Sequence, residues 1–169
     1  APKGTALPDY PTDATGLSSF TLAGAVSSDG ITWSTGKDSD PLRNWAKEVE
    51  RLIASDEGGT VEAPLMYTDK NTLETIFGAG NVTATAATAD HGALVSVEVA
   101  PGVSASPAAF LFIMKDGDNM MLVGTTHGYI SEISDIGFKA TEAINWEATI
   151  TASDKWVIID DNGQTTEES

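Results

Sequence analysis

The clearest pattern of apolar and polar positions lies between residues 108 and 129, where two apolar runs flank a short polar turn. Residues 108–114 and 120–123 are almost purely apolar, and residues 115–119 (KDGDN) separate them. Asp-Gly between β-favouring runs is among the strongest local signals for a β-hairpin. Strands that are apolar on both faces are usually covered on both sides. The pattern predicts a central hairpin within a sandwich core or at a subunit interface.

Alternation of apolar and polar residues predicts most of the other strands. After Gly80 the chain is expected to be β almost throughout. Pro64 indicates an edge position for the strand that contains it, because proline donates no backbone hydrogen bond. The expected strands cover residues 20–26, 31–35, 60–67, 82–87, 93–99, 136–141, 144–152 and 156–159.

Two segments have helical spacing, and only one of them is unambiguous. Residues 68–77 place apolar side chains at i, i+3 and i+4, carry capping-box spacing at Asn71 and Glu74, and end at Gly78. They predict a short helix. Residues 40–55 fit a helix that starts with an Asp-Pro pair. They fit equally well a strand that leads into a Gly-rich turn, and the residues alone leave both alternatives open.

Length and composition predict one domain with two terminal segments. At 169 residues and 41% hydrophobic content, residues 20–160 are expected to form a single β domain. Residues 1–19 hold three of the seven prolines and are expected to form an extended arm, either disordered or ordered only against another subunit. Residues 161–169 are expected to form a flexible acidic tail. The chain does not begin with Met, so we expect a trimmed or incomplete N-terminus.

Charge and composition exclude several classes of function. The chain has 25 acidic and 9 basic residues, a net charge of -16, and no cysteine. Such a surface repels polyphosphate, which disfavours DNA wrapping and binding to anionic membranes. Disulfide scaffolds and thiolate metal sites are excluded. No apolar run reaches the roughly 20 residues that a membrane helix needs.

The sequence nominates no catalytic or cofactor site. His91 and His127 each precede a glycine in a loop-like setting, and no nucleophile elbow is present. Segments 116–119 and 160–162 offer oxygen ligands but lack the twelve-residue loop of a calcium hand. Turn formation explains these carboxylates equally well. We therefore expect no enzyme activity, no cofactor and no metal site.

The order of several short segments resembles a known family. The segments are APKGTALP at residues 1–8, SSDGIT at 27–32, VERL at 49–52, TVEAPLMYT at 60–68, TIFG at 75–78, NVT at 81–83 and IGFKATEAINWEATI at 136–150. In this order they resemble the major tail tube protein of long, flexible-tailed bacteriophages, particularly those of actinobacteria. The resemblance covers nearly the whole chain.

The resemblance implies a β-sandwich or small barrel with one short helix, and it favours strands over a helix for residues 45–55. The residues alone leave helix or strand open for 42–54. It implies that subunits form hexameric rings whose sheets join into an inner β-barrel, and that the rings stack into a tube in the virion tail, assembled in the host cytoplasm. Implied partners are the tape measure, tail terminator and tail-tip proteins. Genomic DNA is expected to pass through without specific binding, and the family members usually begin some residues before this arm.

Elementary electrostatics agrees with a tube, because an acidic wall passes DNA without holding it. The polar faces of the alternating strands are the expected wall, and exposed strand edges are expected to pair within the ring. The alternative function is an acidic immunoglobulin-like module that recognises carbohydrate or a receptor. Candidate residues for the subunit interface come from the arm, the loop 34–41 and the central hairpin. They are Pro2, Pro8, Thr35, Lys37, Phe110, Phe112, Met120 and Leu122.

Overall fold

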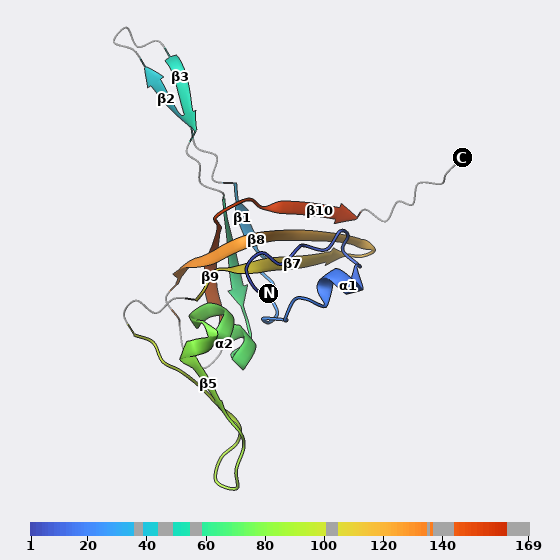
Figure 1. The fold of residues 1–169 in the computed structure, drawn as a ribbon, viewed down its shortest axis with the longest axis vertical. Coiled ribbons are helices and arrows are strands. Elements are labelled where there is room, and N and C mark those ends of the chain that lie inside the picture. The colour runs from blue at the N-terminus through green and yellow to red at the C-terminus, as the bar shows by residue number, and fades with distance from the viewer. Residues whose placement is uncertain are drawn as a thin grey trace, which may run out of the picture.

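The computed structural model describes residues 1–35, 39–43, 49–54, 59–100, 105–134, 136 and 144–161. These residues form a curled six-stranded sheet and two separate two-stranded hairpins (Figure 1). The strands are β1 (Thr32–Ser34), β2 (Ser39–Arg43), β3 (Val49–Ala54), β4 (Thr60–Leu65), β5 (Val82–Thr85), β6 (Leu94–Val97), β7 (Ala108–Asp116), β8 (Asn119–Ile133), β9 (Trp146–Ala152) and β10 (Val157–Asp161). The helices are α1 (Ala14–Leu17), α2 (Lys70–Phe77) and the 3-10 turn η1 (Ala79–Asn81). The prediction of a mainly β fold with a short helix is confirmed.

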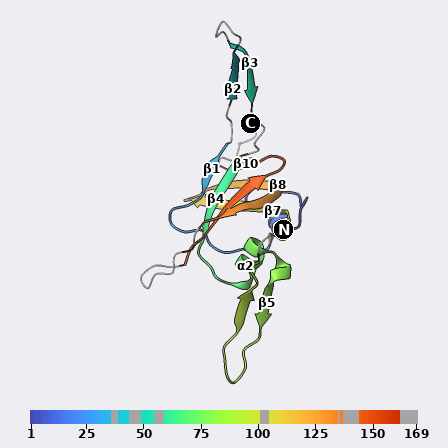
Figure 2. The same ribbon diagram turned by 90° about the vertical axis from the view of Figure 1, so that its left-hand side faces the viewer.

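Strand β8 organises the sheet, whose order is β1-β4-β9-β8-β10 with β7 also paired to β8. Residues 120–124 of β8 pair with both β7 and β10, so these two strands lie on opposite edges of β8. Gly128 pairs with both β7 and β9, which places β9 on the same edge as β10. The sheet turns strongly along β8, so that β1, β4 and β9 run across the direction of β7 and β10 (Figures 1 and 2).

The central hairpin is confirmed, and its second strand is longer than predicted. Asp116 and Asn119 close a two-residue turn in which Gly117 has φ +61°. β8 then continues to Ile133, well past the predicted end at residue 123. His127 therefore lies in a strand, and its assignment to a loop is wrong. The polar stretch keeps strand geometry because antiparallel partners satisfy its backbone groups, first β7 up to Gly128 and then β9 from Gly128 to Ile133.

Two glycines in β8 allow other segments to approach the sheet closely. A Cβ atom at Gly124 would lie 2.9 Å from Cδ2 of Leu7, and a Cβ at Gly128 would lie 2.7 Å from Cδ2 of Phe110. Both distances are shorter than normal van der Waals contact. A side chain at either position would displace the neighbouring Leu7 or Phe110 side chain. A glycine-containing stretch also weakens the strand signal in the sequence.

Residues 39–43 and 49–54 are strands, and the helical alternative for this region is wrong. Asp40 and Pro41, which fit a helix start, lie in β2 opposite Ile53 and Leu52 of β3. The antiparallel pairing satisfies backbone groups of both segments and overrides a weak helical periodicity. The hairpin β2–β3 projects away from the sheet (Figures 1 and 2).

Strand β4 is an interior strand, so the edge position predicted from Pro64 is wrong. The amide of Ser27 donates to the carbonyl oxygen of Pro64 at 2.9 Å. In an antiparallel strand the N–H and C=O of one residue point to the same side. The side of Pro64 that lacks an N–H therefore faces residues 25–27. No hydrogen bond between β4 and β9 is lost because of this proline. The strand predicted for residues 20–26 is reduced to a single bridge between Val26 and Leu65.

The inward face of β4 and β9 supports the hydrophobic core, as alternation predicts. Every second side chain of these two strands is buried against the interior. These side chains are Val61, Ala63, Leu65, Trp146, Ala148, Ile150 and Ala152. The intervening residues face outward and are mostly Thr or Glu.

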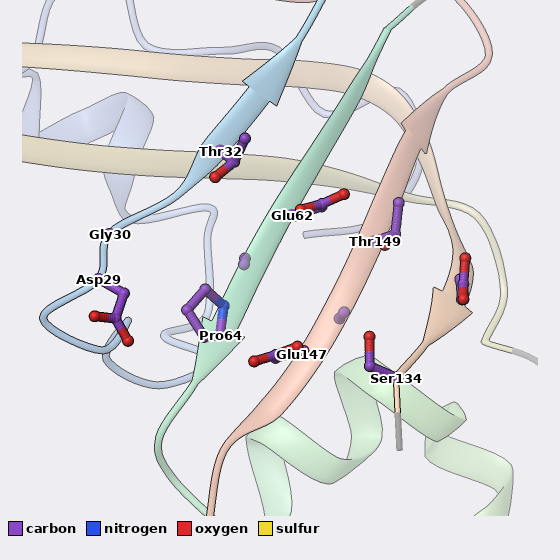
Figure 3. A pocket seen from close by; sticks show the side chains of 11 residues that line it. Asp29, Gly30, Thr32, Glu62, Pro64, Ser134, Glu147 and Thr149 are labelled. Atoms are coloured by element: carbon purple, nitrogen blue, oxygen red, sulfur yellow. The ribbon is translucent and has the colours of Figure 1, made fainter. Parts of the chain in front are cut away.

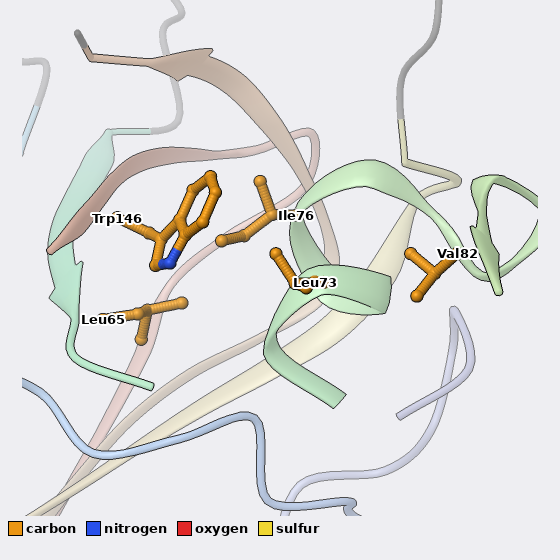
Figure 4. Close-up of a cluster of buried hydrophobic side chains, with 5 residues drawn as sticks. All are labelled: Leu65, Leu73, Ile76, Val82 and Trp146. Atoms are coloured by element: carbon orange, nitrogen blue, oxygen red, sulfur yellow. The ribbon is translucent and has the colours of Figure 1, made fainter. Parts of the chain in front are cut away.

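Helix α2 closes one end of this core. Leu73 and Ile76 pack with Leu65, Val82 and Trp146 in one buried cluster (Figure 4). Burial of these apolar side chains, rather than helix propensity, holds an eight-residue helix in place.

The ends of α2 have defined caps. The Asp69 carboxylate accepts a 2.8 Å hydrogen bond from the amide of Thr72 and is the N-cap, so the predicted cap at Asn71 is wrong. The hydroxyl of Thr72 donates to the carbonyl of Ala23, which ties the preceding loop to the helix. The predicted stop at Gly78 is confirmed, and its φ is +87°.

The N-terminal arm packs on the sheet of its own chain. Ala1 and Ala109 exchange two hydrogen bonds of 3.1 and 2.9 Å, and the amide of Gly4 donates to the carbonyl of Thr126 at 2.9 Å. Pro8 is buried. The prediction that the arm orders only against another subunit is therefore wrong for these contacts. The predicted strand 136–141 and tail 161–169 lie almost wholly outside the described residues.

Leu73→Ala tests the packing of α2. Leu73 is 3% exposed, so truncation should lower the free energy of unfolding by about 2–5 kcal/mol. Leu22 is 75% exposed, and Leu22→Ala is the matched control, with an expected change within about 0.5 kcal/mol. Urea denaturation of the soluble subunit measures both. Equal effects of the two variants would contradict this account of the core.

Asp69→Ala tests the helix cap and its pH dependence. The hydrogen bond from the backbone amide of Thr72 holds the pKa of Asp69 below its usual value of 3.8. The cap therefore contributes fully above pH 3.8, and its contribution is lost as the pH falls through the lowered pKa. Asp69→Ala should cost about 0.5–2 kcal/mol at neutral pH, and Asp69→Asn, which keeps an acceptor, should cost less. Urea unfolding as a function of pH should show the wild-type advantage over Asp69→Ala shrinking in acid.

Candidate assembly surface

The three-stranded segment, defined as β7, residues 119–128 of β8 and β10, contains two terminal strands of the sheet. Among the described residues, β8 is the only strand that pairs with β7. The arm covers only the first part of the outer β7 edge, through the bridge between Pro2 and Ala108 and the bonds to Ala109. The segment therefore has an open edge on β7 and a terminal strand, β10, on its other side.

The backbone groups at these edges can be assigned from the register. Asp116 and Asn119 close a two-residue hairpin and form a hydrogen-bonded pair, so every second residue back along β7 also bonds to β8. Ala109 bonds to Ala1 on the opposite side, which agrees with this alternation. Leu111 and Ile113 consequently direct their N–H and C=O groups away from β8. On β10 the same alternation places the outward groups at residues 158 and 160.

Exposed apolar side chains accompany the open edges. Ile113 on β7 is 48% exposed, Met121 on β8 is 36% exposed and Ile158 on β10 is 44% exposed. Met121 pairs with Met114 of β7 on one side and with Asp160 of β10 on the other. Apolar side chains that line unpaired backbone are the usual features of a surface that another strand covers.

The interface residues predicted from the sequence differ in how far they are exposed. Pro8, Phe110 and Leu122 are buried and stabilise the subunit, so they present no surface to a partner. Pro2 and Thr35 are exposed, and Lys37 lies outside the described residues. Phe112 and Met120 are half-buried in the three-stranded segment, where Phe112 contacts the ring of Trp156 at a centroid distance of 6.5 Å.

Sequence reasoning missed Ile113, Met121 and Ile158. Residues 108–114 are almost uniformly apolar, so the sequence carries no alternation that separates the two faces of the strand. The apolar run 157–159 has the same difficulty. The only available signal was the Asp-Gly turn, because it fixes which residues pair and therefore which backbone groups point outward.

The outward face of β4, β8 and β9 is acidic and slightly hollowed (Figure 3). A hollow of about 300 Å³ is lined by Glu62 of β4, Glu147 of β9, Glu132 of β8 and Asp29. Its lining residues include no Lys, Arg or His. The polar face expected from alternation thus carries four carboxylates on one surface.

Each of the two histidines makes one short polar contact through Nδ1. Nδ1 of His127 lies 2.8 Å from Oγ1 of Thr126, and Nδ1 of His91 lies 2.7 Å from the carbonyl oxygen of Gly92. Within the described ranges, no group of three or more His, Asp or Glu side chains is placed to hold a metal ion. None of the described helices is long and apolar enough to cross a membrane.

Comparison with protein families identifies the relationship. The model of the family described as phage tail tube protein matches residues 1–160. The chain belongs to the phage tail tube protein family. The predicted resemblance is confirmed, and the mainly β fold agrees with it. A comparison with curated proteins gave no match. As a family member the chain is a structural component of the virion tail, which implies a non-enzymatic role and assembly with other tail proteins.

Amide hydrogen exchange of the free subunit tests the assignment of the β7 edge. The amides of Leu111 and Ile113 should exchange with little protection, because their N–H groups face outward. The amides of Phe112 and Met114 should exchange much more slowly, because they bond to β8. Residue-resolved exchange by NMR measures both sets. Equal protection of the two sets would show that the edge is covered or that the alternation is wrong.

Proposed function

We propose that this chain assembles into hexameric rings that stack into the tail tube of a long-tailed phage and form an electronegative conduit for DNA ejection. Membership of the tail tube family supports the assembly. The proposal rests mainly on the three-stranded segment. Its two outer strands, β7 and β10, pair with opposite edges of the same stretch of β8, and both are terminal strands of the sheet.

The two edges are suited to pair with each other in neighbouring copies. A β10 strand laid beside β7 of the next copy continues the ladder, because both strands direct alternate backbone groups outward. Such a contact joins two different surfaces, and it forms a ring when the repeated rotation returns to the first copy. Ring closure removes both open edges, which otherwise expose a monomer to irregular edge-to-edge association.

The charge of the chain suits a conduit for DNA. A net charge of -16 and an outward face with four carboxylates repel phosphate groups. Few cations are available for the multivalent phosphate contacts that would hold DNA during transit. In this proposal the tube surrounds the tape measure protein before ejection, and the tail terminator and tail-tip proteins cover its ends.

Ile113→Pro tests ring assembly. Proline removes one outward N–H from β7 and leaves the bonds between β7 and β8 in place, so the subunit should fold but not form rings or tubes. Ile158→Pro should have the same effect through β10. Ile113→Val and Ile158→Val keep the donors and are the matched controls. Electron microscopy and sedimentation velocity measure assembly, and far-UV circular dichroism measures folding.

A mixture of the two proline variants sharpens the test. Each variant retains one intact edge, β10 in Ile113→Pro and β7 in Ile158→Pro. Heterologous pairing therefore allows at most a heterodimer and no ring. Tubes formed by either proline variant would refute the role of the β7 and β10 edges. A wild-type chain that stays monomeric even with a tail-tip seed would refute the proposed assembly.

A further inference from the structure

The hairpin β5–β6 extends beyond the body of the subunit. It follows α2 and points away from the sheet, at the opposite end of the molecule from β2–β3 (Figures 1 and 2). Residues 83–96 are all exposed, and only its base is covered by the core. A two-stranded ribbon without further cover is at most marginally stable in water.

The two faces of this ribbon differ in chemistry. Val82 pairs with Val97 and Ala84 pairs with Val95, and these four side chains form one face, which we call the apolar ribbon face. Val82 and Val97 pack against the core cluster at the base. Ala84 and Val95 continue the same face beyond the body, where Val95 is 38% exposed. The core surface therefore continues outward without a partner among the described residues.

The opposite face is mainly polar. It carries Thr83, Ser96 and Thr85, with Leu94 as its one apolar member. The hydroxyl of Ser96 donates to the carbonyl of Thr83 at 3.4 Å. This face is suited to water, so the ribbon has one side to be buried and one side that tolerates solvent.

Charge indicates which kind of partner the apolar ribbon face accepts. Residues 82–97 contain one carboxylate, Asp90, and no Lys or Arg, although the whole chain has a net charge of -16. Two copies of such a chain repel each other wherever their acidic surfaces meet, and they approach most readily through an uncharged apolar surface. A basic partner would instead be attracted to carboxylates, which this ribbon lacks almost entirely.

We propose that the apolar ribbon face docks on a second copy of this chain. The inference rests on the proposed tube and adds a contact besides the β7 and β10 edges. The ribbon lies at one end of the molecule. In the proposed tube it meets a different surface on the next copy, because a repeating assembly requires a heterologous contact.

Val95→Asp tests this contact, with Ser96→Asp as its matched control. Both variants add one carboxylate to the same exposed strand, but only Val95→Asp places it on the apolar ribbon face. Val95→Asp should raise the protein concentration needed for assembly at least about tenfold, because the charge is buried without a partner. Ser96→Asp should raise it less than about twofold, because a solvent-facing charge is only weakly penalised. Sedimentation and electron microscopy measure assembly, and melting temperatures of the free subunits confirm folding.

A single-cysteine experiment provides a second readout in subunits that assemble normally. The chain contains no cysteine, so Val95→Cys and Ser96→Cys each introduce one thiol. Maleimide should label both in the free subunit, and assembly should slow the labelling of Val95→Cys much more than that of Ser96→Cys. Suppose that wild type forms tubes. The ribbon contact is then refuted, and the tube is retained, by any of three results: Val95→Asp assembles normally, both Asp variants fail alike, or Val95→Cys stays reactive in tubes. Failure of wild type to assemble refutes both.

Discussion

Hydrogen bonding of backbone groups at sheet edges is the constraint on which this structure depends. β8 pairs with β7 on one side as far as Gly128 and with β10 and β9 on the other, so it forms the centre of the sheet. β7 and β10 are left as terminal strands. An uncovered row of N–H and C=O groups is a template on which another strand can pair. The proposed ring uses these two edges for that purpose.

Packing supports that arrangement from inside the subunit. The alternating strands β4 and β9 bury one face, and α2 covers it through Leu73 and Ile76. On the other part of the sheet, the arm lies over β8, where Gly124 leaves room for Leu7. Neither cover extends along the whole outer edge of β7. The same contacts that stabilise the monomer therefore leave its assembly edge available.

Charge and apolar surface have separate roles in this chain. Carboxylates gather on the outward face of β4, β8 and β9, and they would repel DNA phosphates in the proposed conduit. The exposed apolar side chains of the three-stranded segment and of the ribbon β5–β6 include Ile113, Met121, Ile158 and Val95. In the proposed assembly, strongly acidic subunits would approach each other through these uncharged side chains, where repulsion is weakest.

The sequence by itself determined the elements with a strong local signal. Asp-Gly between apolar runs predicted the central hairpin, alternation predicted β4 and β9, and spacing with Gly78 predicted α2. The order of its motifs indicated the family. Only the tertiary structure decided that residues 39–43 and 49–54 are strands, that the polar stretch around His127 belongs to β8, and that Pro8, Phe110 and Leu122 are buried. The reason is physical: periodicity shows which side chains avoid water, whereas strand partners, edges and covering segments depend on contacts between residues far apart in the chain.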